Sequence, residues 1–353
     1  MISPARRHML KLGIVALLAP AASGVMAQSA VPFYKPGDVV AGLYQHWAQP
    51  RAAAFSDTAK KLHAALATFC SAPSASPQSA AAARSAWQTA VTDWERLSSV
   101  PFGPLIERRS VRAIDFQPTR PQLIERAIKQ APRGASAMER IGTPAKGLPA
   151  LEWLLWEKPV TSGSQGCAYA VEVAADVARE ADALQQAFAS ARPGEWDNEQ
   201  TANAFTEFVN QWVGSIERLR WQEIERPVRE AKSKSRSAAR FPRHAAGSTA
   251  DSWATHWNAL RDLAVFSQQE VPQAGQAVIP MERYLLGRGQ IALVQRWKKA
   301  FAEAATSMQG LTPGAQDKLL PAAKRLASIK RMAEEEVAPA LNVSIGFSDA
   351  DGD

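Results

Sequence analysis

The chain of 353 residues is 46% hydrophobic and carries a formal net charge of +7 at pH 7. This length exceeds one typical hydrophobic core, so we expect two domains. The Lys and Arg residues are spread along the chain instead of clustering. This spread indicates a solvated surface and excludes nucleic acid as a partner.

The first 27 residues have the pattern of an export signal. A charged stretch with Arg6, Arg7 and Lys11 precedes a short apolar stretch and a small-residue exit at Ala27. The Arg6-Arg7 pair resembles a twin-arginine signal, although the general secretory route also fits. Cleavage near Ala27 would leave a periplasmic chain with a formal charge of +4, because three basic residues and no acidic one are removed. No later stretch reaches the roughly 18 apolar residues of a transmembrane segment.

Apolar residues recur at intervals of three and four through most of the mature chain, which predicts amphipathic helices. Tryptophan and phenylalanine mark the clearest stripes, in 80–100 and 201–221. No stretch alternates apolar and polar residues for long enough to predict a sheet. We therefore expect an all-α protein with helices at 39–71, 80–100, 121–132, 168–192, 201–221, 250–267, 290–309 and 315–338.

Both cysteines, Cys70 and Cys167, would lie in an oxidising compartment after export. A disulfide between them is the expected use of such a pair. Two buried free thiols are the alternative.

Connections rich in Pro, Gly and Ser separate the predicted helices, which favours antiparallel bundles. We expect an export signal at 1–27, a first bundle at 28–195 and a second bundle at 196–353. The basic segment 232–248 is interpreted as a polar excursion on the surface of the second bundle.

A short repeat supports two related bundles. The sequence GLPALEWLLW (147–156) aligns with AVIPMERYLL (277–286), so that Glu152 matches Glu282. A proline two or three residues before each glutamate suits the first turn of a helix. Each carboxylate would then lie near a helix N-terminus, where negative charge is favoured.

Three longer strings carry a family resemblance: FGPLIERRSVRAIDFQPTR (102–120), KGLPALEWLLW (146–156) and GCAYA (166–170). In this order, after a Trp-rich helix, they resemble the imelysin-like family of bacterial periplasmic and outer-envelope proteins. The resemblance spans most of the mature chain. It implies an all-helical fold of two related bundles with a candidate site near their junction.

Some members of that family carry a GxHxxE signature, proposed to bind metal and once taken to mark a peptidase. In this chain Gly147 and Glu152 match the signature, whereas Pro149 stands at the position of the histidine. Proline has no side-chain ligand atom, and a catalytic zinc usually needs three protein ligands. No HExxH, GxSxG or Cys/His arrangement replaces the missing ligand.

The candidate site residues are Glu152, Glu282, Asp115, Arg112 and Gly147. We expect Glu152 to be buried and to pair with a donor, because a lone buried charge is costly. Arg112 is the candidate partner, unless it belongs to a solvated loop cluster of arginines. The three carboxylates would line a polar junction that holds a small ligand or a metal ion, and their oxygens suit iron or another hard cation.

Three functions follow as hypotheses. The first is a non-catalytic periplasmic binding or accessory protein of the imelysin-like type, linked through its family to iron or other metal acquisition. Its partners would be a small ligand or metal and a periplasmic or outer-membrane protein. The second is a structural or protein-interaction scaffold without a ligand. The third is a metallopeptidase, which would require a water-activating metal. The histidines of the mature chain are scattered, and we interpret His256 as a packed or surface residue and not as a ligand.

Overall fold

The structure is a computed structural model that describes residues 31–72, 76–233, 239–268 and 270–346. The predicted export signal therefore lies outside the described residues. Helices and no strand occur within the described ranges, which confirms the all-α prediction. No helix in this part of the chain is long and apolar enough to cross a membrane.

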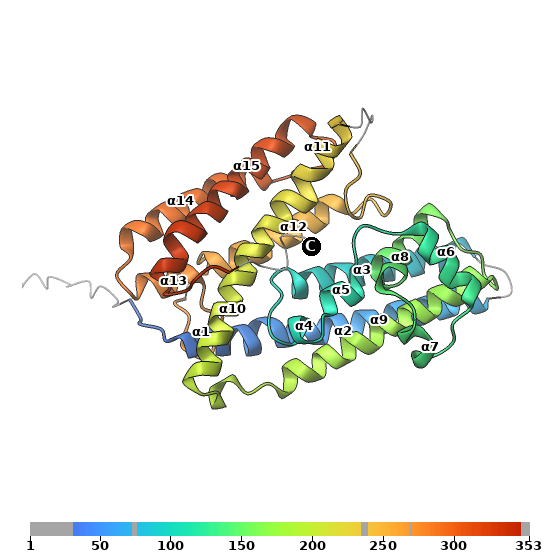
Figure 1. The fold of residues 1–353 in the computed structure, drawn as a ribbon, viewed down its shortest axis with the longest axis horizontal. Coiled ribbons are helices and arrows are strands. Elements are labelled where there is room, and N and C mark those ends of the chain that lie inside the picture. Colours follow the sequence, from blue (N-terminus) through green and yellow to red (C-terminus); the bar gives the residue numbers. More distant parts are fainter. Residues whose placement is uncertain (1–30, 73–75, 234–238, 269, 347–353) are drawn as a thin grey trace, which may run out of the picture. The chain divides into compact units, whose positions relative to one another are not determined.

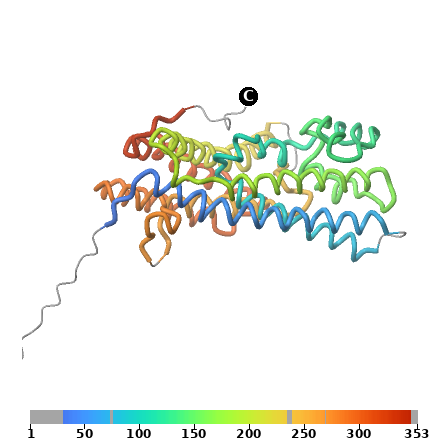
Figure 2. Tube along the Cα trace, turned by 90° about the horizontal axis from the view of Figure 1, so that it is seen from below, coloured from blue at the N-terminus to red at the C-terminus, as the bar shows by residue number. Residues whose placement is uncertain are grey.

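Long antiparallel helices form the frame of the first half (Figure 1). Serine N-caps define where two of these helices begin. Ser76 before α3 and Ser164 before α9 each accept a hydrogen bond from a first-turn N–H at 3.1 Å. Figure 2 shows two of these helices, α2 and α9, running side by side. The frame consists of α1 (Pro36–Gly42), a π-helical turn (Leu43–Ala48), α2 (Gln49–Ser71), α3 (Pro77–Ser98) and α9 (Gln165–Ser190).

The disulfide between Cys70 and Cys167 is confirmed, with Cα atoms 5.5 Å apart. It joins the end of α2 to the start of α9. The two helices are therefore linked covalently at one end.

Five short helices connect α3 to α9, and one glycine fixes how they meet. Gly147 has φ +81° and lies close to the C-terminal end of α5. A Cβ on Gly147 would be 2.3 Å from the carbonyl oxygen of Ile114. Only glycine fits there, which brings the start of α8 against the backbone of Ala113 and Ile114. The helices are α4 (Pro104–Glu107), α5 (Ser110–Ile114), α6 (Pro121–Gln130), α7 (Ala135–Glu139) and α8 (Gly147–Glu152), which continues as a π-helical turn (Trp153–Glu157).

The second half is built from a further set of helices around a tryptophan-rich core. Trp212, Trp297 and Phe301 lie in mutual ring contact, with centroids 4.9–6.2 Å apart. The set comprises α10 (Asn198–Glu217), a π-helical turn (Arg218–Glu225), α11 (Arg226–Ser233), α12 (Thr249–Ala264), α13 (Met281–Leu286), α14 (Ile291–Met308), α15 (Gln316–Met332), a π-helical turn (Ala333–Val337) and α16 (Ala338–Ala340).

Helix α12 connects the two halves, as does the contact between α1 and α10. It contacts α3 of the first half as well as α10, α13 and α14 of the second (Figure 1). The described residues from Pro32 onward form one compact unit with a continuous buried core. The division into related bundles at 28–195 and 196–353 remains a prediction.

The basic segment at 232–248 is only partly at the surface. Residues 234–238 lie outside the described ranges, but Phe241 and Arg243 are buried. The surface interpretation was therefore wrong for the part that leads into α12. This part is buried because Arg243 pairs with the carboxylates of Glu95 and Asp115, and because the ring of Phe241 packs edge-on against that of Trp253, with centroids 5.1 Å apart.

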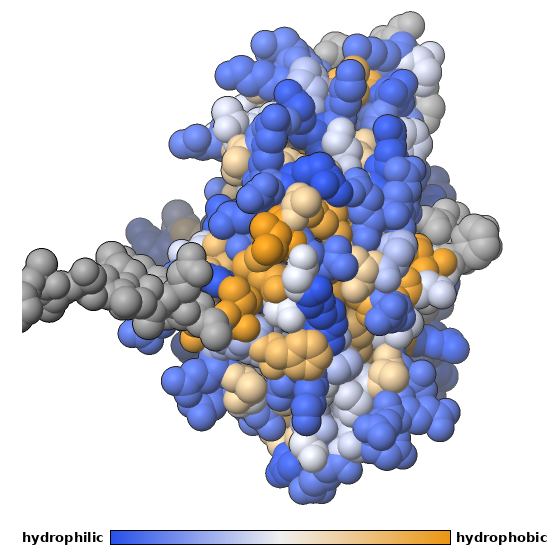
Figure 3. Space-filling model, turned by 90° about the vertical axis from the view of Figure 1, so that its left-hand side faces the viewer, coloured by the Kyte–Doolittle hydropathy of each residue, from blue (hydrophilic) through white to orange (hydrophobic). Residues whose placement is uncertain are grey.

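Some apolar side chains stay at the surface near the start of the described chain, and Figure 3 shows apolar residues, in orange, on this face of the molecule. Phe33 and Ile291 are 65% and 60% exposed. Single exposed apolar residues are common on soluble proteins and do not define an interface.

Candidate functional site

The guanidinium of Arg243, in the loop before α12, lies at the centre of a carboxylate cluster in which Glu95 is buried and the Asp115 side chain is 18% exposed. Arg243 is only 3% exposed. Its Nε donates to Oε1 of Glu95 at 3.1 Å, and its Nη2 donates to Oδ2 of Asp115 at 2.6 Å. Two carboxylates thus compensate a cation that would be costly to bury alone.

The loop is built to direct Arg243 inward. Arg243 has φ +61°, a left-handed conformation that few residues other than glycine adopt. Such a conformation costs on the order of 1 kcal/mol or more and persists only where the surroundings impose it. Here the Thr249 hydroxyl donates to the Pro242 carbonyl at 2.7 Å, and the Ser248 N–H donates to the Arg243 carbonyl at 3.2 Å.

Glu95 connects α3 to α12 through its carboxylate. It is 3% exposed, and its Oε1 accepts from the Ser252 hydroxyl of α12 at 2.7 Å as well as from Arg243. The same oxygen therefore receives a donor from the helix and a donor from the loop before it.

Asp115 follows α5 and accepts three donors. Besides Arg243, these are Trp94 Nε1 at 3.2 Å and Gln117 Nε2 at 3.3 Å. Burial alone would raise the pKa of the Asp115 carboxyl, but the charge of Arg243 and the three hydrogen bonds outweigh it. The pKa of Asp115 therefore lies below its ordinary value, and the group is ionised.

Glu152 is buried, as predicted, with 6% of its surface exposed. Its Oε1 accepts the backbone N–H of Ala246 at 3.1 Å. Burial raises the pKa of the Glu152 carboxyl, and the charge of Arg243 and the Ala246 N–H offset only part of that rise. Glu152 lies in the second turn of the helical stretch that begins at Gly147, beyond the first turn where a helix N-terminus stabilises charge.

Arg112 is not the partner of Glu152, so that pairing was predicted wrongly. The Arg112 side chain is exposed, and its guanidinium lies 5.8 Å from the ring centroid of Phe116. The cation whose charge acts most strongly on Glu152 is Arg243, and His244 has a smaller effect. The loop before α12, more than ninety residues after Glu152 in the sequence, therefore supplies the contacts that we had expected from Arg112.

Glu282 lies at the opposite end of α12. It is 2% exposed; its Oε2 accepts the Phe266 N–H at 2.7 Å, and its Oε1 lies 3.4 Å from Lys298 Nζ. The 16 residues of α12 separate the two loops, a distance of about 24 Å at the usual helical rise. The structure thus brings Glu152 and Asp115 together around Arg243, with Gly147 at the start of the same helix, but it does not bring Glu282 to them.

A second buried ion group lies beside α12. His256 Nδ1 and Glu223 Oε2 are 2.8 Å apart, and Arg218 donates to the carbonyl oxygens of Ser98 and Ser99 at the end of α3. Burial lowers the pKa of His256, but the charge of Glu223 and its hydrogen bond more than reverse this, so the pKa is raised. Glu223 therefore favours the protonated form of His256.

The sequence reading missed Glu95, His256 and Arg243. Glu95 follows Val91 by four residues, which places it on the apolar stripe of α3, and His256 follows Trp253 by three. A charged or titratable residue on a buried stripe was a usable signal in both cases. Arg243, within a polar and basic loop, gave none.

The cluster does not fit a metal ion of the kind that the GxHxxE signature implies. No group of three or more His, Cys, Asp and Glu side chains is arranged to hold a metal in the part of the chain that the structure describes. Glu95 and Asp115 are directed at a guanidinium, and Pro149 supplies no ligand atom. The arrangement neutralises charge and connects elements, but it offers no water-activating centre.

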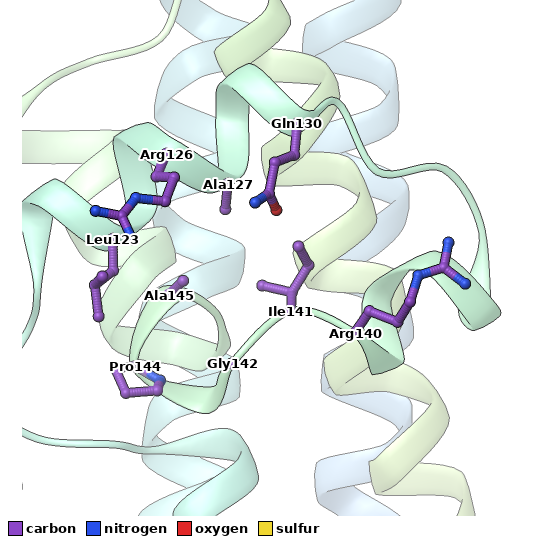
Figure 4. Close-up of a pocket in the computed structure, with 9 residues that line it drawn as sticks. All are labelled: Leu123, Arg126, Ala127, Gln130, Arg140, Ile141, Gly142, Pro144 and Ala145. Atoms are coloured by element: carbon purple, nitrogen blue, oxygen red, sulfur yellow. The ribbon is translucent and has the colours of Figure 1, made fainter.

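A small surface pocket lies elsewhere, between α6 and the segment that follows α7 (Figure 4). In Figure 4 the amide of Gln130 points into it above Ile141, whereas Arg126 and Arg140 lie on opposite sides with their guanidiniums directed away. None of the predicted site residues lines this pocket.

Comparisons with known proteins agree on the family. The family model described as Imelysin (Peptidase_M75) matches residues 48–336. An imelysin-like protein from Psychrobacter arcticum 273-4 has a similar crystal structure, with a TM-score of 0.70 at 16% identity over 90% of this chain and 99% of that one.

A second similar crystal structure comes from Parabacteroides distasonis ATCC 8503, from a protein named as an iron-regulated protein A precursor. Its TM-score is 0.68 at 12% identity, over 87% of this chain and 95% of that one. At such identities the likeness concerns the fold. A search among curated proteins found no match.

Proposed function

This chain belongs to the imelysin family, and we propose that it is a non-catalytic binding or accessory protein of the bacterial periplasm, active in iron acquisition. The iron link is supported by the name of the Parabacteroides distasonis protein of similar fold. The periplasmic location is supported by the export pattern of residues 1–27 and by the disulfide, which suits an oxidising compartment.

The pairing of Arg243 with Glu95 and Asp115 carries the non-catalytic part of the proposal. A metallopeptidase needs a metal with about three protein ligands and an open position for water. Here the carboxylates nearest to the signature residues already share an internal cation, and Pro149 replaces the histidine. Glu152 accepts a loop N–H through Oε1, which gives this carboxylate a structural role.

The scaffold hypothesis is the second candidate, and the position of α12 favours it. Glu95 and Glu152 anchor this helix and its leading loop to α3 and α8. Such contacts would rigidify a platform for a periplasmic or outer-membrane protein partner. The two hypotheses differ in whether a small ligand takes part, and both lack catalysis.

The function is tested by deleting the gene in its host and growing the strain with and without an iron chelator. We expect the protein to accumulate under iron limitation and the deletion strain to grow more slowly there, with full rescue by the wild-type gene. Growth in iron-replete medium is the control. Unchanged protein levels together with unchanged growth under chelation would reject the iron link.

The absence of catalysis has its own assay. We expect purified protein to leave an unfolded substrate protein intact. Cleavage that co-purifies with the chain and disappears in Glu152→Gln would reject the non-catalytic assignment.

A further inference from the structure

We infer that one face of the molecule binds the surface of an anionic phospholipid membrane. This Phe33 face consists of the exposed apolar residues Phe33, Val271 and Ile291 together with the cations Lys35 and Arg288. Apolar side chains would enter the lipid, and the cations would meet its phosphates. Such binding goes beyond the proposed function, which includes no lipid.

Exposed apolar side chains are concentrated on the Phe33 face. Phe33, Ile291 and Val271 are 65%, 60% and 40% exposed. From Pro32 onward, the described residues include one other large apolar side chain that is exposed, Trp221 at 37%. Figure 3 views the end of the molecule where α13 lies and shows apolar residues, in orange, among hydrophilic ones. A single exposed apolar residue is ordinary, but a group of three indicates a contact surface.

Tyr34 holds together the three segments that carry these side chains. It is only 1% exposed. Its hydroxyl donates to the carbonyl of Pro272, which follows Val271, at 2.5 Å. Its own carbonyl accepts from Nη1 of Arg288, three residues before Ile291, at 3.0 Å. The exposed apolar residues therefore belong to segments that meet at one buried tyrosine.

Arg288 presents a fixed cation on the same face. Its guanidinium stacks on the ring of Phe33 at 4.8 Å and on that of Tyr284 at 3.4 Å, measured to the ring centroids. Nη1 is bound to the Tyr34 carbonyl, whereas Nε and Nη2 have no partner in the described part of the chain. Lys35 is exposed and, like Arg288, forms no ion pair there. Both cations can therefore receive an anionic oxygen.

The chain beside this face is basic. From Arg283 to Lys299 it contains five basic residues and no acidic one. The acidic side chains of the adjoining segments are Asp38, which accepts the backbone N–H of Lys35 at 2.7 Å, and the exposed Glu270. Positive charge therefore exceeds negative charge around the three apolar residues. This combination suits a membrane surface, where anionic headgroups cover an apolar interior.

The predicted export signal favours lipid over an acidic protein as the occupant. Its apolar stretch ends at Val25, eight residues before Phe33. Eight residues span at most roughly 28 Å. While that stretch is in the membrane during export, the Phe33 face is therefore held near the lipid surface. This proximity rests on the proposed export, whereas the grouping of apolar residues and the charge do not.

Co-sedimentation with lipid vesicles tests the inference. The exported protein is purified, and its mass shows whether residues 1–27 have been removed. Two sets of vesicles are compared, one of phosphatidylcholine and one of phosphatidylcholine mixed equally with anionic phosphatidylglycerol. We expect wild type to bind the mixed vesicles about tenfold or more tightly, because each basic residue near an anionic surface adds roughly fivefold. High salt should remove most of this difference.

Variants separate the apolar and the charged contributions. The double change Phe33→Ser with Ile291→Ser should weaken binding to the mixed vesicles about tenfold or more. Lys35→Gln should weaken it about fivefold and leave binding to neutral vesicles unchanged. All three side chains are exposed, so each variant should keep the Tm of wild type.

Trp221→Ser is the matched control. Trp221 is also exposed and also lies beside an arginine, Arg220, whose guanidinium is 5.5 Å from the ring centroid. Arg220, however, is paired with Glu217 and Glu225. Trp221→Ser should therefore leave vesicle binding unchanged.

Wild type that fails to sediment with the mixed vesicles would overturn the inference. Equal binding by wild type and by the double variant of Phe33 and Ile291 would do the same. If wild type binds no vesicles but associates with itself in analytical ultracentrifugation, and the double variant does not, the Phe33 face is a contact between copies and the inference is wrong. An uncleaved mass would count against the proposed location alone, because the comparison among variants still decides lipid binding.

Discussion

At each end of α12 a buried glutamate accepts a backbone N–H from the adjoining loop, but the charged groups around the two glutamates differ. At one end Glu152 accepts the N–H of Ala246, and at the other Glu282 accepts the N–H of Phe266. Beside Glu152 lie two more carboxylates and the buried Arg243, whereas the ion-pair partner described for Glu282 is Lys298, whose side chain is 56% exposed. Glu152 and Glu282 therefore each hold a loop through its backbone N–H, and the charged cluster around Arg243 is present only at the Glu152 end.

The halves also differ in covalent linkage, because both cysteines of the chain lie in the first half. The Cys70–Cys167 bond spans 97 residues. Replacing both cysteines by serine should lower the free energy of unfolding by about 4 kcal/mol if the chain-entropy account holds. Urea unfolding of the variant measures this, and reduced wild type serves as a matched control. A loss below about 1 kcal/mol would show that packing alone holds α2 to α9.

Glu95→Gln tests the charged end of α12. It leaves Arg243 with a single ion-pair partner in a buried site, so we expect a loss of about 3 kcal/mol in the free energy of unfolding. Glu282→Gln is the matched change at the other end, where Lys298 can turn to solvent, and should cost about 1 kcal/mol. Equal losses in urea unfolding would contradict the asymmetry between the two ends.

Glu152→Ala and Glu282→Ala test the hydrogen bond that each glutamate accepts from a loop N–H. Each leaves one loop N–H without its acceptor, so each should lower the free energy of unfolding by about 1–2 kcal/mol. Hydrogen exchange should also accelerate at Ala246 in the first variant and at Phe266 in the second. A loss of more than about 3 kcal/mol for Glu152→Ala alone would mean that Glu152 is a primary partner of a buried cation.

The ion group at His256 predicts a pH dependence. The pKa of His256 is raised in the folded state, so folding takes up a proton, and stability falls as pH rises from about 6.5 through the folded pKa. The groups that act on His256 are Glu223, Glu95 and Arg218. The free energy of unfolding of wild type should exceed that of His256→Gln by a larger margin at pH 6 than at pH 9. A difference that stays constant over this range in urea unfolding would contradict the assignment.

The fold was largely predictable because burial follows helical periodicity. The stripe of Trp87, Val91 and Trp94 defines the buried face of α3, and the disulfide was predicted from the cysteine count and the expected compartment. Burial of Glu152 followed from its apolar neighbours. These properties depend on residues close together in the sequence.

The site was less predictable because its central contact is long-range. Arg243 lies 148 residues from Glu95 and 128 from Asp115 along the chain, and its loop has a polar, basic composition typical of a surface. Nothing local distinguishes a buried arginine there from a solvated one. The same limit explains why Arg112, which is nearer to Glu152 in sequence, was the wrong partner.

A double-mutant cycle between Arg243 and Asp115 tests most directly whether the cluster is neutralised from within. Arg243→Met, Asp115→Asn and the double variant are compared with wild type by urea unfolding. Each single change leaves the other group of the ion pair without this partner, and the double change removes both groups, so we expect a coupling free energy of about 2 kcal/mol or more. Losses that add to within about 0.5 kcal/mol would contradict the account, because Arg243 would then not be the counter-ion of the cluster.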